Sequence, residues 1–117
     1  MPVNRQDVER IVTAVPGFRV TWEKSLEEWE AEGSLLWYVA MSELAPYVVD
    51  NYANGTTEGF ADLFVAIESF LDKPDTELEN LIAVGLFEDI QNIASHRRFG
   101  AVPFRQWLGP RSHVVWD

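Results

Sequence analysis

Residues 75–116 read DTELENLIAVGLFEDIQNIASHRRFGAVPFRQWLGPRSHVVW and contain the strongest helical pattern of the chain. Aliphatic residues recur on every turn of its first half, which is typical of the central helix of a small domain. Six polar residues, here called the polar cluster, interrupt this pattern near its end: Glu88, Asp89, Gln91, Asn92, Ser95 and His96. We expect these side chains either to reach the surface or to hydrogen-bond one another inside the protein.

Helical patterns also fill the preceding residues. Five helices are expected within the outer limits 4–16, 21–33, 34–55, 57–74 and 75–96. Apolar side chains at helical spacing mark the buried faces of three of these helices: Val8, Ile11, Val12, Val15, Trp22, Leu26, Trp29, Phe60, Leu63, Phe64, Ile67 and Leu71. The helices are expected to start at Asn4, about Thr21, Ser34, Thr57 and either Asp75 or Thr76.

Prolines and glycines punctuate the pattern. Gly33 is expected to end the second helix in a left-handed conformation, and Pro46 predicts a kink or a break in the third. Short helical turns are expected over 104–108 and 112–116, and β-type alternation is confined to 18–21. The sequence therefore predicts an all-α single domain over 1–117. About five main helices would pack as antiparallel helical hairpins, with short helical turns at the C-terminal end.

Composition narrows the class of protein. The chain of 117 residues contains no cysteine, which excludes disulfides, thiolate zinc sites and a thiol nucleophile. The N-terminal residues lack the apolar region of a signal peptide. The longest apolar runs, 35–41 and 81–87, are far shorter than the roughly 20 residues that cross a bilayer. We expect a cytoplasmic protein without membrane contact.

Charge is unevenly distributed along the chain. Residues 1–95 contain 18 Asp and Glu against five Lys and Arg, whereas residues 96–117, the C-terminal segment, contain four Arg and one Asp. An acidic surface repels nucleic acid and anionic membranes and speeds association with a basic partner. It also serves simply as a solvated surface, and the sequence leaves both explanations open.

Five carboxylates crowd the second expected helix and are here called the acidic strip: Glu23, Glu27, Glu28, Glu30 and Glu32. Like charges four residues apart on a helix cost a few tenths of a kcal/mol each. Solvent exposure is the commoner cause of such a charge run. The strip is nevertheless the best candidate on this chain for binding a cationic protein surface.

Asp89, Asn92 and His96 share one face of the fifth expected helix. An Asp–His pair can serve general base catalysis, but seven residues of helix separate the two side chains by about 10.5 Å. A polar network that caps the helix and holds the following loop is therefore the favoured interpretation. We expect no enzyme.

No other motif indicates a metal or cofactor. The two histidines lack zinc-ligand spacing, and the acidic residues at 72–79 lack the glycine of a calcium loop. Phosphate loops, dinucleotide fingerprints and nucleophile elbows are missing from the sequence. We expect neither a metal nor a cofactor.

The C-terminal segment interleaves four Arg with Phe99, Phe104 and Trp107. Such a pattern can stack on and clamp single-stranded nucleic acid, but the acidic residues before it would oppose a polyanion. We favour a structural role, in which the arginines neutralise Glu88, Asp89 or other helix carboxylates and the aromatic rings seal one end of the core.

The segment AVGLFEDIQNIASHR (83–97), followed by FRQWLGPRS and a closing Trp (104–116), resembles an uncharacterised bacterial family of small helical proteins. Its members read VGFLEDLQN-x-x-SH, then F-x-x-x-LGP-x-S and a Trp. The patterns at 46–49 and 64–68 extend the resemblance over most of the chain, although Leu-Phe replaces the usual Phe-Leu before Glu88. The resemblance implies an immunity protein of a polymorphic toxin system, as in contact-dependent inhibition.

These observations together favour an immunity protein that binds and neutralises the C-terminal domain of a cognate bacterial toxin. A basic nuclease, either an RNase or a DNase, would suit the charge of this chain. The acidic strip is the first candidate for the contact. The second is Glu88, Asp89, Asn92 and His96, if these side chains are exposed.

Two alternatives from other classes stay open. One is a small helical regulatory or scaffold module that binds an endogenous protein in an aromatic groove lined by Trp22, Trp29, Trp37 and Trp107. A toxin gene beside this one would favour immunity, and a metabolic operon would favour regulation. The other is a hydrolase, which requires Asp89 and His96 to meet in one polar pocket.

Overall fold

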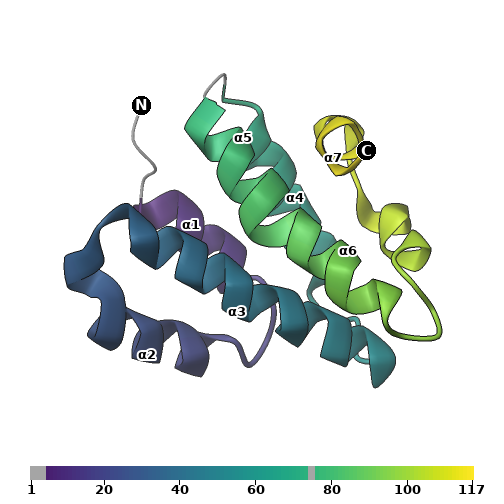
Figure 1. The fold of residues 1–117 in the computed structure, drawn as a ribbon, viewed down its shortest axis with the longest axis horizontal. Coiled ribbons are helices and arrows are strands. Elements are labelled where there is room, and N and C mark those ends of the chain that lie inside the picture. Colours follow the sequence, from purple (N-terminus) through teal and green to yellow (C-terminus); the bar gives the residue numbers. More distant parts are fainter. Residues whose placement is uncertain (1–4, 74–75) are drawn as a thin grey trace.

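The computed structural model describes residues 5–73 and 76–117, and every regular element within those ranges is helical (Figure 1). The α-helices are α1 (Arg5–Val12), α2 (Arg19–Trp29), α3 (Ser34–Ala53), α4 (Phe60–Leu71), α5 (Thr76–Ile82), α6 (Glu88–Ser95) and α7 (Pro110–Trp116). Three shorter elements join them: the 3₁₀ turn η1 (Glu30–Glu32), the π-helical turn η2 (Ala83–Phe87) and the 3₁₀ helix η3 (Val102–Trp107). The all-α prediction is confirmed.

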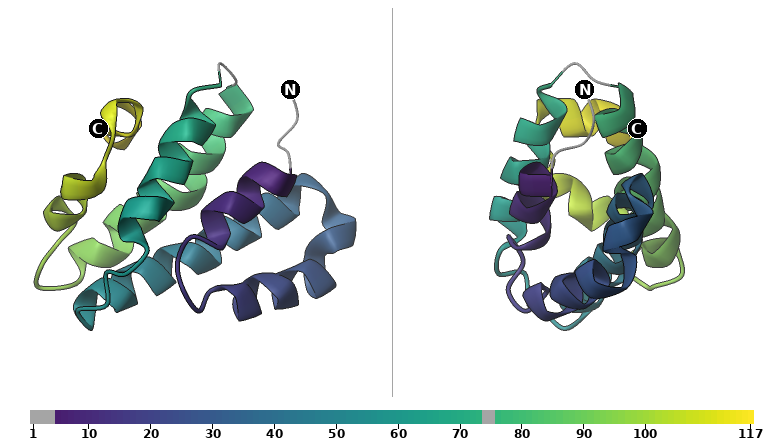
Figure 2. Two further views of the ribbon diagram at one scale, coloured as in Figure 1. Left: turned by 180° about the vertical axis from the view of Figure 1, so that it is seen from behind. Right: turned by 90° about the vertical axis from the view of Figure 1, so that its left-hand side faces the viewer.

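Two antiparallel pairs organise the fold. α2 and α3 form a hairpin through η1 and Gly33, and α4 runs antiparallel to the continuous rod of α5, η2 and α6 (Figures 1 and 2). Gly33 has a positive φ of +61° as expected, but its ψ of −125° lies outside the left-handed helical conformation predicted for it. The α-helix itself ends at Trp29, and the last three residues of the expected second helix tighten into the 3₁₀ turn.

The longest helix, α3, occupies the centre of the molecule and packs against α1, α2, α5, η2 and α6. Pro46 lies inside it without breaking it, so the predicted break is absent. Proline removes one backbone donor from the helix, but α3 stays continuous within its packing against these five neighbouring elements. α3 therefore takes the central place that the sequence pattern suggested for residues 75–96.

α4 begins later than expected. Its N-cap is Gly59, with a φ of +85°, and no side chain caps its first turn, so the Thr57 cap is wrong. Residues 57–59 form a turn in which the Phe60 amide donates to the Thr57 carbonyl at 3.1 Å. The expected starts at Asn4 and Asp75 lie outside the described residues, as does the side chain of Thr76.

Residues 76–95 form one rod, as predicted, but with a π-helical turn in the middle. The Glu88 amide donates to the carbonyl of Ala83, five residues earlier. Gly85 lies in this turn against α3, where an added Cβ would stand 3.2 Å from Cδ1 of Tyr38 and 3.4 Å from Cβ of Met41. The absence of a side chain at Gly85 thus permits the close approach of η2 to α3.

The side chains of all these helices meet in one hydrophobic core. Of the predicted buried residues, nine are fully buried: Val8, Ile11, Val12, Val15, Trp22, Phe60, Leu63, Phe64 and Ile67. Leu26, Trp29 and Leu71 pack at its edge. None of the helices within the described ranges has both the length and the hydropathy needed to cross a membrane.

Candidate functional site

All five carboxylates of the acidic strip are exposed, on α2 and η1. The other face of α2 is anchored to the body: the indole of Trp22 donates to Glu9 at 3.2 Å, and Ser25 donates to Glu43 at 2.5 Å. Glu30 pairs with Arg5 at 3.4 Å. Within the described ranges, the other four carboxylates form no ion pair. The strip is therefore a rigidly held, largely uncompensated anionic surface.

The polar cluster runs along α6 from its first turn, reaches the surface and does not form an internal network. Glu88, Asn92 and His96 are exposed, and Asp89 is half-buried. Ser95 donates to the carbonyl of Asn92 at 2.7 Å. The second candidate contact surface, made of Glu88, Asp89, Asn92 and His96, is thus accessible to a partner, as its proposed role requires.

The structure does not bring Asp89 and His96 together. His96 follows the last residue of α6, and its Nδ1 lies 3.3 Å from the hydroxyl of Ser95. Asp89 lines two adjoining hollows on another part of the rod, and neither hollow includes His96. This geometry offers no support for a hydrolase that uses these two side chains as a pair.

The first of these hollows has a volume of about 320 Å³ and lies between α3 and η2. Its lining is mostly apolar and comprises Tyr38, Val39, Ser42, Val84, Gly85 and Asp89. The second, of about 460 Å³, is lined by Glu88, Asp89, Gln91 and Asn92. The carboxylates were predictable from the sequence, but the apolar part was not, because the α3 residues meet η2 only in the tertiary structure.

Asp89 occupies an unfavourable place for a charge. The pKa of the Asp89 carboxyl is raised above its usual value of 3.8. Partial burial is the larger cause, and the negative charge of Glu88 is the smaller one. A carboxyl whose pKa is raised in the folded state stabilises the fold only while it is protonated, and this contribution is lost as the pH rises through the folded pKa. At neutral pH the ionised Asp89 therefore slightly destabilises the fold.

We expect Asp89→Asn to raise the free energy of unfolding at pH 7 by about 0.5 kcal/mol or less, because solvent screens this half-exposed group. Urea titrations of both proteins at pH 7 and at pH 3 would measure the difference. The advantage of the variant should shrink at pH 3, where Asp89 itself becomes protonated. A variant clearly less stable than the parent at pH 7 would contradict this assignment.

The C-terminal segment folds back on the body, and three of its four arginines, Arg97, Arg105 and Arg111, form ion pairs within the protein. Arg97 pairs with Asp50 of α3 at 2.6 Å, and Arg105 pairs with Asp117 at 2.5 Å. The structural role predicted for these arginines is thus confirmed, but their partners are not Glu88 or Asp89. The pairing follows the path of the chain, which leads away from α6 after Ser95 and returns against α4 (Figure 1).

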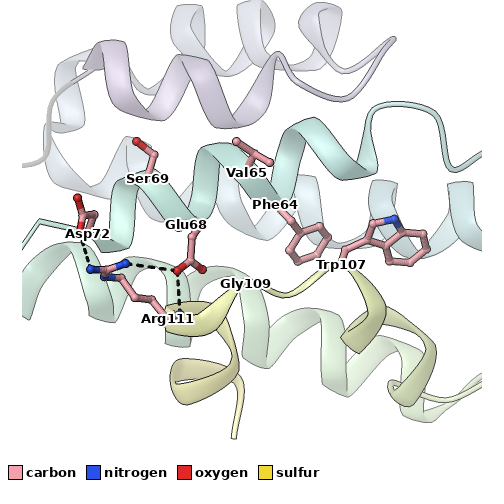
Figure 3. A pocket seen from close by; sticks show the side chains of 8 residues that line it. All are labelled: Phe64, Val65, Glu68, Ser69, Asp72, Trp107, Gly109 and Arg111. Atoms are coloured by element: carbon pink, nitrogen blue, oxygen red, sulfur yellow. Dashed lines mark hydrogen bonds and ion pairs between the residues drawn. The ribbon is translucent and has the colours of Figure 1, made fainter.

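Glu68 of α4 holds the start of α7. Its carboxylate accepts a hydrogen bond from the backbone amide of Arg111 at 2.8 Å (Figure 3). It also accepts hydrogen bonds from the backbone amide and the hydroxyl of Ser112, at 3.0 and 2.9 Å. Partial burial alone would raise the pKa of Glu68, but these hydrogen bonds and the charge of Arg111 outweigh it and lower the pKa. A Cβ at Gly109 would lie 2.5 Å from the Glu68 carboxylate, so glycine makes room for this contact.

A hollow of about 400 Å³ beside Glu68 is shown in Figure 3. Its charged residues already bind one another, since Arg111 contacts Asp72 at 2.6 Å and Glu68 at 3.7 Å. We therefore regard this hollow as the seam where the C-terminal segment joins α4. Within residues 5–73 and 76–117, no three His, Asp or Glu side chains are grouped as metal ligands.

Comparison with family models gives one match, to a domain of unknown function (DUF7674) over residues 8–117. Neither the curated proteins nor the solved structures give a match.

Proposed function

Because the chain belongs to the DUF7674 family, whose function is unknown, we propose a function from its surface: an immunity protein that binds and neutralises a cognate bacterial toxin domain. The observation that carries this proposal is the acidic strip. It is exposed, anchored from behind by Trp22 and Ser25, and largely free of internal ion pairs. Such a surface matches a basic protein, and nucleases are basic because they bind polyanions.

The paired arginines of the C-terminal segment also favour a basic protein as the partner. Arg97, Arg105 and Arg111 are paired within the fold, so they offer little attraction to nucleic acid or anionic lipid. The proposed partner is thus the toxin's C-terminal domain, an RNase or a DNase, with no direct contact to nucleic acid or membrane. The protein would act in the cytoplasm, by occupying the basic surface with which the toxin holds its substrate.

The regulatory or scaffold alternative loses its proposed groove. Trp22 is buried on α2, whereas Trp107 packs edge-on against Phe60 at 5.0 Å in the C-terminal segment. These two elements lie at opposite ends of the molecule (Figures 1 and 2), so the tryptophans do not line one surface. A regulatory role would need another binding face.

The direct test is recovery of a toxin. The tagged protein would be expressed with the open reading frames that neighbour its gene, and bound proteins would be isolated at low and at high salt. A tight, salt-sensitive complex with a basic toxin domain, together with rescued growth, would support the proposal. Recovery of no neighbour and no protection against any of them would contradict it.

We expect the double reversal Glu27→Lys/Glu30→Lys to reduce the association rate constant for the toxin at least about tenfold at low salt. The effect should shrink near about 0.5 M salt, because screening shortens the range of the charges. Stopped-flow fluorescence would measure both rates.

The matched control is Glu58→Lys/Glu79→Lys, which makes the same change in net charge at two exposed carboxylates outside the strip. If both double variants slow association equally, net charge alone steers the encounter. The strip would then not be the contact surface.

A further inference from the structure

The hollow between α3 and η2 combines an apolar wall with two carboxylates at one end. Tyr38, Val39 and Val84 contribute the apolar lining, and the second hollow continues from Asp89 to Glu88. Val84 exposes 53% of its surface. An apolar trough that leads to an anionic end is complementary to a long cationic side chain, which has an apolar stem and a charged head.

The geometry of this trough depends on the π-helical turn. The hydrogen bond from the Glu88 amide to the Ala83 carbonyl spans one residue more than an α-helical hydrogen bond. The side chains after the turn are therefore rotated about the helix axis relative to the side chains before it. Gly85 brings the turn within van der Waals contact of Tyr38. π-turns inside α-helices are found frequently at functional sites.

The carboxylates of the trough differ from most others near the C-terminal segment. Asp50, Asp72 and Asp117 each pair with an arginine of this chain. Glu88 and Asp89 pair with no Lys, Arg or His within the described ranges. The two carboxylates are adjacent, so their negative charges repel each other without a cation to offset them. A cation placed between them would reduce their mutual repulsion and, through its attraction to the ionised Asp89, offset the cost of desolvating that carboxylate.

We propose that this trough binds one arginine side chain of a protein partner. Its aliphatic stem lies on Val39 and Val84, its guanidinium plane contacts the Tyr38 ring, and its N–H groups donate to Asp89 and Glu88. Arginine fits better than lysine, because its planar head both stacks on an aromatic ring and binds carboxylates through two hydrogen bonds. The inference rests on the proposed function, since a basic toxin domain would supply the arginine.

The probe is the blocked tripeptide acetyl-Gly-Arg-Gly-amide, and its matched control is the same peptide with citrulline, which keeps the shape and loses the charge. Both would be titrated into the ¹⁵N-labelled full chain and followed by amide chemical shifts. The arginine peptide is expected to shift the amides of Ser42, Gly85 and Asp89, and the citrulline peptide to leave them in place.

Two variants make the test specific. Asp89→Asn is expected to weaken arginine-peptide binding at least about tenfold, as expected for the loss of a charge-assisted hydrogen bond. Glu79→Gln removes the same charge from an exposed position of α5 and should leave binding unchanged. Shifts spread evenly over the acidic strip, or equal effects of the two variants, would overturn the proposal. So would trough shifts that follow protein concentration without peptide, because a second copy would then occupy the trough.

The outcome is separable from that of the toxin experiment. Peptide binding in the trough without any recovered toxin would contradict the immunity function and leave the arginine site standing. A toxin complex whose affinity is unchanged by Asp89→Asn would contradict the arginine site and leave the immunity function standing.

Discussion

Phe104→Ala is expected to lower the free energy of unfolding by about 3–5 kcal/mol. The Phe104 side chain has no exposed surface and sits where the C-terminal segment closes the core. Its ring centre lies 4.9 Å from that of Tyr52 and 6.3 Å from that of Trp107. Truncation removes these aromatic contacts and leaves a cavity, because Tyr52 is fixed to α3 and Trp107 to η3, so the remaining rings cannot collapse together.

Urea denaturation followed by circular dichroism would measure this loss. Val102→Ala is the matched control: Val102 lies two residues earlier in η3 and is 74% exposed, so its truncation should change stability by less than about 0.5 kcal/mol. If Phe104→Ala costs less than about 1 kcal/mol, these rings do not seal the core. A stacking surface for nucleic acid bases would then return as the better explanation of this segment.

Glu68→Ala is expected to lower the free energy of unfolding by about 2 kcal/mol. The Glu68 carboxylate supplies the acceptor for three donors at the start of α7, including the buried hydroxyl of Ser112. No side chain of α7's own N-cap residue, Gly109, can replace it. The loss therefore leaves the first turn of α7 without its cap.

The stabilisation by Glu68 should depend on pH. The pKa of this carboxyl is lowered in the folded state, so its contribution is fully present above the unfolded value of about 4.5 and is lost as the pH falls through the folded pKa. Denaturation of the parent and Glu68→Ala at pH 7 and at pH 2.5 would show the difference shrinking in acid. A difference that is equal at both values would contradict the charged-acceptor role.

Asp72→Ala is the control for this experiment. Asp72 also pairs with Arg111, at 2.6 Å, but both side chains are mostly exposed. Exposed ion pairs of this kind contribute about 0–1 kcal/mol, so this variant should remain close to the parent. If the two variants are equally destabilised, the ion pairs with Arg111, and not the capping hydrogen bonds, hold α7.

Internal pairing of the arginines also bears on function. The C-terminal segment carries a formal charge opposite to that of residues 1–95, but much of its positive charge is directed at Asp50, Glu68 and Asp72. The acidic strip lies at the other end of the molecule and is therefore not neutralised by this segment (Figure 1). A partner that approaches α2 meets a predominantly negative surface, in which Arg19 and Lys24 are the exposed cations of that helix.

The helices and their buried faces were predictable from the sequence because both depend on local spacing. Val8, Ile11 and Val12 fall on one side of a helix whatever surrounds them, and their apolar side chains must leave water. Exposure of the acidic strip follows in the same way, since unpaired carboxylates are seldom buried. Excess negative charge on this part of the molecule is likewise a property of the sequence alone.

Other features required the tertiary structure. The sequence gives no local sign of the π-turn, which packs with Gly85 against Tyr38 of α3. The Thr57 cap is wrong because a turn moves the N-cap of α4 two residues along the chain, to Gly59. In both cases the backbone conformation is associated with contacts between elements far apart in the sequence, and helical periodicity carries no information about such contacts.

Composition and periodicity by themselves determined that the fold is all-helical, which faces of three helices are buried and where the surplus charge lies. Only the folded arrangement decided that Arg97 meets Asp50, that Glu68 caps α7, and that Asp89 lies at the end of an apolar trough. The reason is physical. Apolar burial is a property that each residue carries with it, whereas an ion pair, a cap or a binding hollow exists only between groups that the fold brings within a few ångströms.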